Sequence, residues 1–168
     1  MAQYERELKG ILQGDDDTLR RATKRCDEVE KAYYWQVTKC PFIVVRAAGS
    51  LGVDLIGVRS DITLLIEVKA SSHPVIRFSG DPRLMEQANR LKEAGGKVGL
   101  APLYAYRLKR CKGDPWRLFA LPMDAELEGV QGLIYRRLPK VARTPQGNYV
   151  LRWHEGMPLN GFIAYLCQ

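Results

Sequence analysis

The chain has 168 residues, of which 46% are hydrophobic and 27% are charged, a composition typical of one globular domain with a sizeable core. Its formal charge of +7 favours a polyanionic partner, because lysine and arginine side chains that neutralise phosphates release condensed counterions. No apolar run approaches the roughly 18 residues of a membrane-spanning helix, and the start of the chain has no signal-peptide pattern. We therefore expect an intracellular, cytoplasmic protein with no membrane partner.

The cysteines argue against a zinc site. Cys26, Cys40, Cys111 and Cys167 show no paired spacing, and the chain has two histidines that could join them, whereas structural zinc sites need closely spaced ligand pairs. We expect free thiols, as in a reducing compartment.

The N-terminal segment 3–13 is expected to form a short helix, since its apolar residues recur on one face. Glu5 lies four residues before Lys9, so its side chain can either reach a neighbouring site or form a minor ion pair in solvent. From the helical pattern alone, the ion pair is the preferred interpretation.

Segment 14–41 is expected to contain a second helix that begins near Thr18 and ends before Pro41. Its lysines and arginines could follow a DNA backbone, and Tyr34 or Trp35 could stack on bases. Aromatic residues of this kind pack more often in a core or at a dimer interface, and packing is the interpretation that we favour.

The most informative stretch is 52–70, which follows an expected strand at 42–46 and a loop of small residues. Two apolar runs, 53–59 and 63–69, flank Ser60 and Asp61 and predict a β-hairpin. If the turn is centred on this pair, Asp54 lies opposite Glu67 on the same face, with Cβ atoms about 5 Å apart. Lys69 follows Glu67 by two residues and shares that face.

Two carboxylates this close repel each other unless a divalent cation lies between them. Oxygen ligands suit Mg²⁺ or Mn²⁺ better than Zn²⁺, and Lys69 could position a water molecule or neutralise a phosphoryl oxygen. The pattern thus indicates hydrolysis of phosphodiesters. The alternative is a solvated edge hairpin with a surface ion pair, but both strands carry apolar residues on both faces, as covered strands do.

The remaining elements complete an α/β pattern. Segment 75–78 is expected to be extended, and Asp81 to cap a helix that has Pro82 in its first turn and ends at Gly95. Strands are expected at 97–106 and 116–121, on either side of a basic loop. Segments 133–137, 149–153 and 161–166 are expected to be short strands or a terminal helix. The prediction is a mixed sheet with helices on both faces, in one domain (1–168) with a helical insertion at 14–41 and a basic C-terminal extension at 122–168.

Several motifs resemble a known family. Val53-Asp54 followed by Glu67-Val68-Lys69 resembles the PD-(D/E)XK nuclease signature, with valine where the motif often has proline. YERELKGIL (4–12) and VVRAAGSLGVD (44–54) are similar to segments of archaeal-type Holliday junction resolvases (Hjc). RecB-like exonucleases of the same superfamily have a helical glutamine followed four residues later by tyrosine, whereas Gln87 here is followed by Leu91.

The resemblance implies a restriction-endonuclease-like α/β fold and a homodimer that resolves four-way DNA junctions by paired nicks, with Mg²⁺ as cofactor and Mn²⁺ as a substitute. A two-fold symmetric junction needs two identical active sites, which such a dimer supplies. The residues implied are Glu5, Asp54, Glu67 and Lys69 as the catalytic group, Glu5, Asp54, Glu67 and the Val68 carbonyl as metal ligands, and Arg6, Arg46 and Ser50 as DNA contacts.

Two alternatives remain open at this level. One is a different PD-(D/E)XK endonuclease, restriction-like or specific for another branched DNA. The other is a non-catalytic DNA-binding subunit of the same fold, although a binding module has no need for Asp54, Glu67 and Lys69 together.

Overall fold

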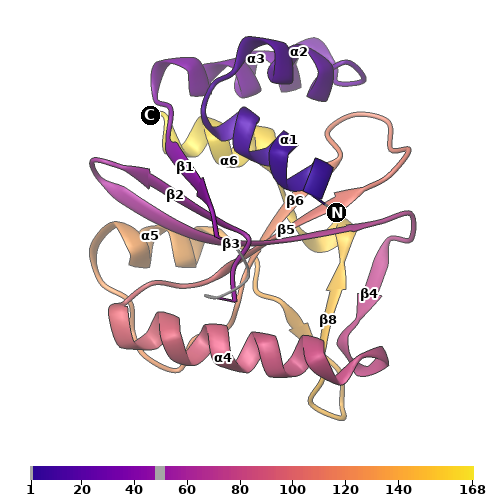
Figure 1. The fold of residues 1–168 in the computed structure, drawn as a ribbon, viewed down its shortest axis with the longest axis vertical. Coiled ribbons are helices and arrows are strands. Elements are labelled where there is room, and N and C mark those ends of the chain that lie inside the picture. The colour runs from indigo at the N-terminus through magenta and orange to yellow at the C-terminus, as the bar shows by residue number, and fades with distance from the viewer. Residues whose placement is uncertain (1, 48–51) are drawn as a thin grey trace.

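The structure is a computed structural model that describes residues 2–47 and 52–168. Within these residues, six strands form a mixed sheet in the order β1-β2-β3-β5-β6-β9, and a smaller sheet has the order β4-β8-β7. Strands β3 and β5 are parallel, and the other neighbours in the large sheet are antiparallel. This is the α/β class that the sequence predicts, with helices on both faces (Figure 1).

The bounds of the elements are as follows. The large sheet consists of β1 (Ile43–Arg46), β2 (Leu55–Arg59), β3 (Ile62–Ser71), β5 (Leu103–Leu108), β6 (Trp116–Ala120) and β9 (Met157–Pro158). The small sheet consists of β4 (Val75–Arg77), β8 (Tyr149–Arg152) and β7 (Ala142–Arg143). The helices are α1 (Ala2–Leu12), α2 (Asp16–Ala22), α3 (Glu28–Trp35), α4 (Pro82–Val98), α5 (Gly129–Arg137) and α6 (Leu159–Leu166).

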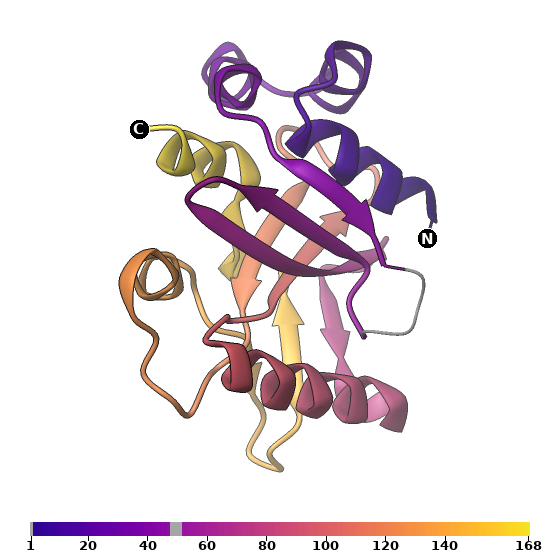
Figure 2. The same cartoon turned by 60° about the vertical axis from the view of Figure 1, so that its left-hand side comes forward.

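Each face of the large sheet has its own core. On one face, α1, α3 and α6 pack on the apolar side chains of the central strands, including Leu55, Ile66 and Leu118. On the other face, α4 and the small sheet pack around Tyr104 and Phe119. Figure 2 shows α4 on one side of the sheet and α1 and α6 on the other. Because β3 is covered on both faces, a charged residue within it needs a specific partner.

Segment 14–41 forms two helices, so the expectation of one continuous helix is wrong. Asp15 caps α2 by accepting a hydrogen bond from the Thr18 N–H (2.9 Å). Asp27 begins α3 with a capping box that it forms with Glu30. Two capping aspartates twelve residues apart start two helices, because each satisfies the free N–H groups of its own first turn.

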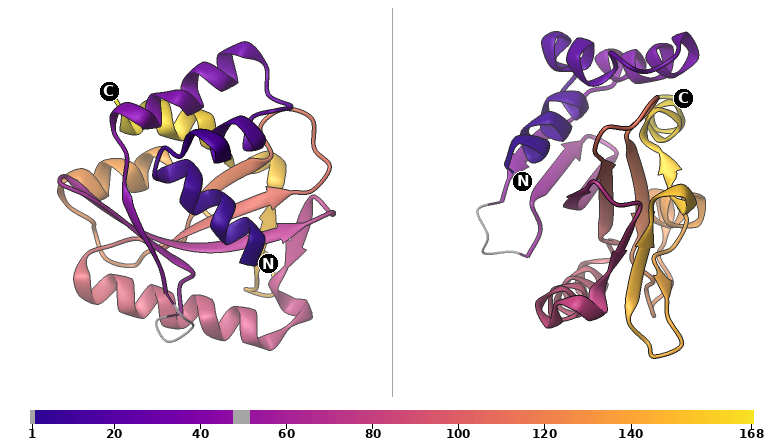
Figure 3. Two further views of the ribbon diagram at one scale, coloured as in Figure 1. Left: turned by 45° about the horizontal axis from the view of Figure 1, so that its top comes forward. Right: turned by 90° about the vertical axis from the view of Figure 1, so that its right-hand side faces the viewer.

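Helix α3 of segment 14–41 is joined to the rest of the fold through buried polar groups. The Tyr34 hydroxyl of α3 donates to the Asp114 carboxylate, whose other oxygen accepts from the backbone and side-chain N–H groups of Asn160 on α6 (2.9 and 2.7 Å). The side chain of Tyr34 is fully buried, as the packing interpretation predicts. In Figure 3, α2 and α3 lie together, farther from the large sheet than α1 and α6.

The cysteine expectation is also wrong for one pair. Cys40 and Cys167 form a disulfide with Cα atoms 5.8 Å apart, across 127 residues of sequence, while Cys26 and Cys111 are free. The sequence spacing gave no sign of this pairing, because α6 brings the end of the chain beside the segment that follows α3.

Several element boundaries differ from the sequence pattern, among them the strand expected at 97–106, which begins at Leu103 because Lys97 and Val98 belong to α4. Helix α4 continues through Gly95 and ends at Gly99, which has a left-handed φ of 71°. A Cβ on Gly95 would lie 2.3 Å from the Leu100 carbonyl oxygen. Gly95 therefore does not end the helix, and its missing side chain lets the segment at Leu100 pass close to the helix. Segment 133–137 belongs to α5 and is not a strand. Among the described residues, no helix combines the length and the apolar character needed to cross a membrane.

Candidate active site

The β2–β3 hairpin has the predicted register. Arg59 pairs with Ile62 and Leu55 pairs with Ile66, and the regular pairing of the two strands ends there. The Asp54 N–H donates to the Ile66 carbonyl (3.1 Å), one residue short of the Glu67 that an unbroken register would place opposite it. Asp54 still lies near Glu67 at the start of β2, since its charge acts on the Glu67 carboxylate.

The carboxylate of Asp54 is fixed by the backbone of β3. Its Oδ2 atom accepts a hydrogen bond from the Val68 N–H at 2.8 Å. The N–H and C=O of one strand residue point to the same side of the strand, so the Val68 carbonyl is directed to the side of Asp54. The two carboxylates and this carbonyl are the candidate ligands at the start of β2.

Glu67 is buried, with 5% of its side chain exposed, and its two oxygens have different surroundings. Oε1 accepts from Lys69 Nζ and from Gln87 Nε2, each at 2.9 Å. Oε2 is buried and has no hydrogen-bond partner among the described residues. A buried carboxylate oxygen without a partner is costly, so Oε2 is an open position for a cation or a donor.

The electrostatics of the pair favour the same conclusion. Burial raises the pKa of Glu67 to about 7, and the charge of Asp54 adds to the rise, against the opposing effect of Lys69. Burial also raises the pKa of Asp54, which the Val68 N–H lowers and the charge of Glu5 raises further. A divalent cation between the carboxylates would favour their charged forms and so oppose both rises. The donor set of carboxylate and carbonyl oxygens suits Mg²⁺ or Mn²⁺.

Glu5 lies at the border of this site, on α1. Its Oε2 atom forms an ion pair with Arg46 Nη2 at 2.8 Å, and Arg46 ends β1 beside the Ala47 N–H, which donates to the Asp54 carbonyl (2.9 Å). Among the described residues, no three acidic, histidine or cysteine side chains are close enough to hold one metal ion. Glu5 is therefore placed to pair with Arg46 rather than to complete a three-carboxylate set.

Of the other two expected DNA contacts, Arg6 lies away from the carboxylates and Ser50 is not described. Arg6 is exposed and lines a cleft between α1 and α2. Ser50 falls in segment 48–51, outside the described residues.

Two side chains that the sequence assigned no role belong to this region. Gln87 of α4 bridges the site, because its amide donates to Glu67 and its Oε1 accepts from Lys69 Nζ (3.4 Å). In the sequence, its position in the first turns of an amphipathic helix was the feature that could have indicated a role in the site. Tyr104 is the β5 neighbour of Glu67, and its buried hydroxyl has no partner among the described residues. An apolar strand pattern gave no reason to single it out.

No family model and no curated protein sequence matches the chain. Among solved structures, the chain is similar to Hjc of Archaeoglobus fulgidus, a Holliday junction resolvase from an archaeal hyperthermophile. The similarity has a TM-score of 0.50 and 18% sequence identity, and it covers 83% of this chain and 98% of the archaeal one. It shows that the chain has the restriction-endonuclease-like fold that its motifs predict.

The raised pKa of Glu67 predicts a pH-dependent stability. Between the ordinary value of 4.5 and about 7, the folded protein keeps a proton that the unfolded chain releases, so the free energy of unfolding falls as pH rises through this window. Glu67→Gln cannot ionise. Between about pH 5 and about pH 8, the free energy of unfolding of the native protein should therefore fall relative to that of Glu67→Gln. The fall should be about 1.4 kcal/mol for each unit by which folding raises the Glu67 pKa.

Urea denaturation at the two pH values, in buffer with a chelator, measures this change. The matched control is Glu93→Gln, an exposed acid on α4, which should follow the native protein. Equal losses of free energy in the native protein and in Glu67→Gln would contradict the assigned burial of the Glu67 charge.

Proposed function

We propose that this protein is a metal-dependent endonuclease that cuts branched DNA, and that its substrate is the four-way junction. The observation that carries the proposal is the buried Glu67 carboxylate, which lies near Asp54, holds Lys69 and leaves one oxygen without a partner among the described residues. Carboxylates with shifted pKa values beside a lysine are typical of sites that hydrolyse phosphodiesters. The fold shared with a Holliday junction resolvase supports the choice of substrate.

Asp54, Glu67 and the Val68 carbonyl would hold Mg²⁺, for which Mn²⁺ would substitute. The cation would supply a water of lowered pKa and neutralise charge on the phosphate. Glu67 Oε2 is the ligand that the described residues leave free, and Asp54 is held in place by the Val68 N–H. Because both carboxylates have raised pKa values, occupation of the site would release protons.

Lys69 would act on the reacting phosphate. Its side chain is 14% exposed and bonds Glu67 Oε1 and Gln87 Oε1, and an ammonium group has three donors. The third donor, which has no partner among the described residues, would orient the attacking water or neutralise a phosphoryl oxygen as its charge grows. Gln87 would keep Lys69 and Glu67 in a fixed relative position.

Arg46 and Glu5 would respond to the arrival of DNA. The Arg46 side chain is 41% exposed while Glu5 is 15% exposed, so a phosphate can reach the arginine from solvent. A phosphate that binds the guanidinium in place of Glu5 would release the Glu5 carboxylate next to Asp54, where it can join the water shell of the cation. Arg6 and Ser50 are the further proposed contacts to the backbone of the substrate.

Paired cuts in a symmetric junction require two active sites, so we include a homodimer in the proposal. An apolar stripe on the edge of the sheet supports it. Ile43 and Val45 on β1 and Val58 on β2 are 73%, 54% and 43% exposed, and Ile43 lies directly opposite Val58 in the ladder. Exposed apolar residues on an edge strand favour association with another chain.

Cleavage should depend on the carboxylate pair. Asp54→Asn and Glu67→Gln should each reduce cutting of an immobile four-way junction in Mg²⁺ by about 1,000-fold or more, because a metal contributes several kcal/mol to the transition state. Both variants should keep junction binding, since the basic surface is unchanged. The measurement is a gel assay of nicks on all four labelled strands, with binding followed by fluorescence anisotropy.

Glu93→Gln is the matched control and should cut at the native rate. Linear duplex and single-stranded DNA of the same sequence should be cut much more slowly than the junction. Native cutting that persists in EDTA, or equal cutting of all three DNAs, would contradict the proposal.

The native chain should form a dimer with twice the 19.1 kDa chain mass. Val45→Lys should convert it to a monomer, because a charge in the apolar stripe cannot be buried without a partner, whereas Val98→Lys, also exposed but at the end of α4, should leave the dimer intact. Light scattering at micromolar concentration gives the masses. A native monomer, or a Val45→Lys dimer, would argue against this interface.

A further inference from the structure

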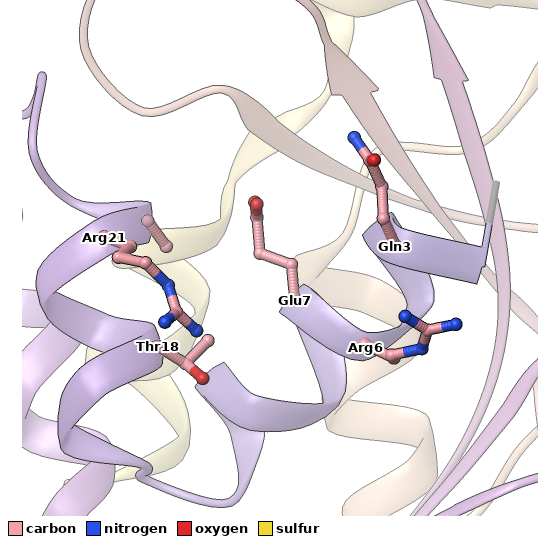
Figure 4. Close-up of a pocket in the computed structure, with 6 residues that line it drawn as sticks. Gln3, Arg6, Glu7, Thr18 and Arg21 are labelled. Carbon is pink, nitrogen blue, oxygen red and sulfur yellow. The ribbon is translucent and has the colours of Figure 1, made fainter.

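The insertion and the loop between β5 and β6 together form a basic surface beside α1. A cleft of about 340 Å³ lies between α1 and α2 (Figure 4), and a second cleft of about 90 Å³ lies between α2 and the β5–β6 loop. Both clefts are lined by Arg21 and Ala22, so they adjoin. We name four of the arginines that line them the arginine strip: Arg21, Arg25, Arg107 and Arg110.

Most arginines of the strip have no ion-pair partner among the described residues. Glu7, which lines the first cleft, pairs with Arg107, and its Oε1 atom accepts from Arg107 Nε (2.8 Å) and Trp116 Nε1 (2.9 Å). Within the described part of the chain, no carboxylate forms an ion pair with Arg21, Arg25 or Arg110, whose side chains are exposed, although the charge of Arg21 acts on Asp15. Exposed guanidinium groups without ion-pair partners favour a ligand with repeated anionic groups, and phosphates match their planar donors.

The strip has a defined shape, because its two segments are tied to each other. The Gly113 N–H of the loop donates to the Arg25 carbonyl of the insertion at 3.0 Å. Arg107 lies over the Tyr4 ring, with its guanidinium carbon 4.9 Å from the ring centroid. Arg110 has a left-handed φ of 58°, a conformation that costs an arginine free energy that a glycine would not lose. The surrounding structure holds this side chain at the tip of the loop despite that cost.

Helix α1 separates the strip from the candidate active site. Glu5 pairs with Arg46 beside Asp54, whereas Glu7 pairs with Arg107 in the strip. Residues two apart on a helix point about 200° from each other, so these contacts lie on opposite sides of α1. In Figure 4, Arg21 extends from α2 toward α1, while Arg6 points to the other side of α1. A single straight duplex in the active site would lie on the Glu5 side and leave Arg21 and Arg25 uncovered.

We propose that the arginine strip binds the phosphate backbone of a second arm of a branched DNA, and that it contributes to selection of branched over linear substrates. The proposal rests on the proposed function for the identity of the ligand. The candidate active site and the arginine strip lie on opposite sides of α1. The diverging arms of a junction can place phosphates on both sides of this helix at once. Recognition through backbone phosphates needs no base contacts.

The test is the binding of Arg21→Ala/Arg25→Ala to a fluorescein-labelled immobile four-way junction and to a linear duplex, in EDTA and over a range of salt. The dissociation constant for the junction should rise about tenfold or more. The slope of log K against log salt should fall by about two, one for each phosphate that the variant no longer neutralises. Affinity for the linear duplex should change by less than about threefold. Both side chains are exposed, so the variant should fold normally.

The matched control is Arg20→Ala/Arg136→Ala, which removes two charges outside the strip. Arg20 is the neighbour of Arg21 but pairs with Asp16 and Asp17, and Arg136 lies on α5; the control should bind the junction like the native chain. Unchanged junction affinity in the strip variant, or equal reductions for junction and duplex, would overturn the proposal. These binding measurements involve no cleavage. Failure of the native chain to cut the junction would therefore count against the proposed function, whereas the role of the arginine strip is decided by the binding measurements alone.

Discussion

The carboxylate of Glu67 is buried in the middle of a mixed sheet, near the carboxylate of Asp54, and the surrounding side chains are arranged around this pair. Burial of two acids in one place is unfavourable unless each finds donors or a cation. The chain supplies a backbone N–H to Asp54 and a lysine and an amide to Glu67, and its described residues leave one oxygen of Glu67 without a partner. The proposed metal site rests on this incomplete satisfaction of Glu67.

The rest of the fold serves to hold that geometry. Strand β3 is central, so both of its faces are covered and Glu67 cannot turn to solvent. Helix α4 covers one face and contributes Gln87, whereas α1 brings Glu5 and Arg46 together at the border of the site. The insertion packs through Tyr34 and Asp114 onto α6, so it presents its arginines from a fixed position rather than from a loose loop.

The parts of the site that depend on local geometry could be predicted from the sequence. The alternation of β-strands and a two-residue turn fix which residues face each other, so the register from Arg59 with Ile62 to Leu55 with Ile66 followed from counting. The capping residue Asp81 and the start of α4 at Pro82 followed from local chemistry in the same way.

The parts that depend on contacts distant in sequence could not be predicted. The disulfide between Cys40 and Cys167 requires the docking of α6. Arg107 belongs to the strip because Glu7, a hundred residues earlier, binds it. In both cases a tertiary contact decides between two local alternatives. The break between α2 and α3 is different, because the capping box of Asp27 and Glu30 is local and has a sequence signal, which the helical spacing of the apolar residues around it obscured.

The central claim is that Asp54 and Glu67 hold a divalent cation. The most direct measurement is the anomalous diffraction of a crystal soaked in millimolar Mn²⁺. The account predicts one strong peak roughly 2.0 to 2.3 Å from Asp54, Glu67 Oε2 and the Val68 carbonyl oxygen, which disappears in a crystal of Glu67→Gln. A well-ordered site with no peak between the two carboxylates, or a peak that persists in Glu67→Gln, would contradict it.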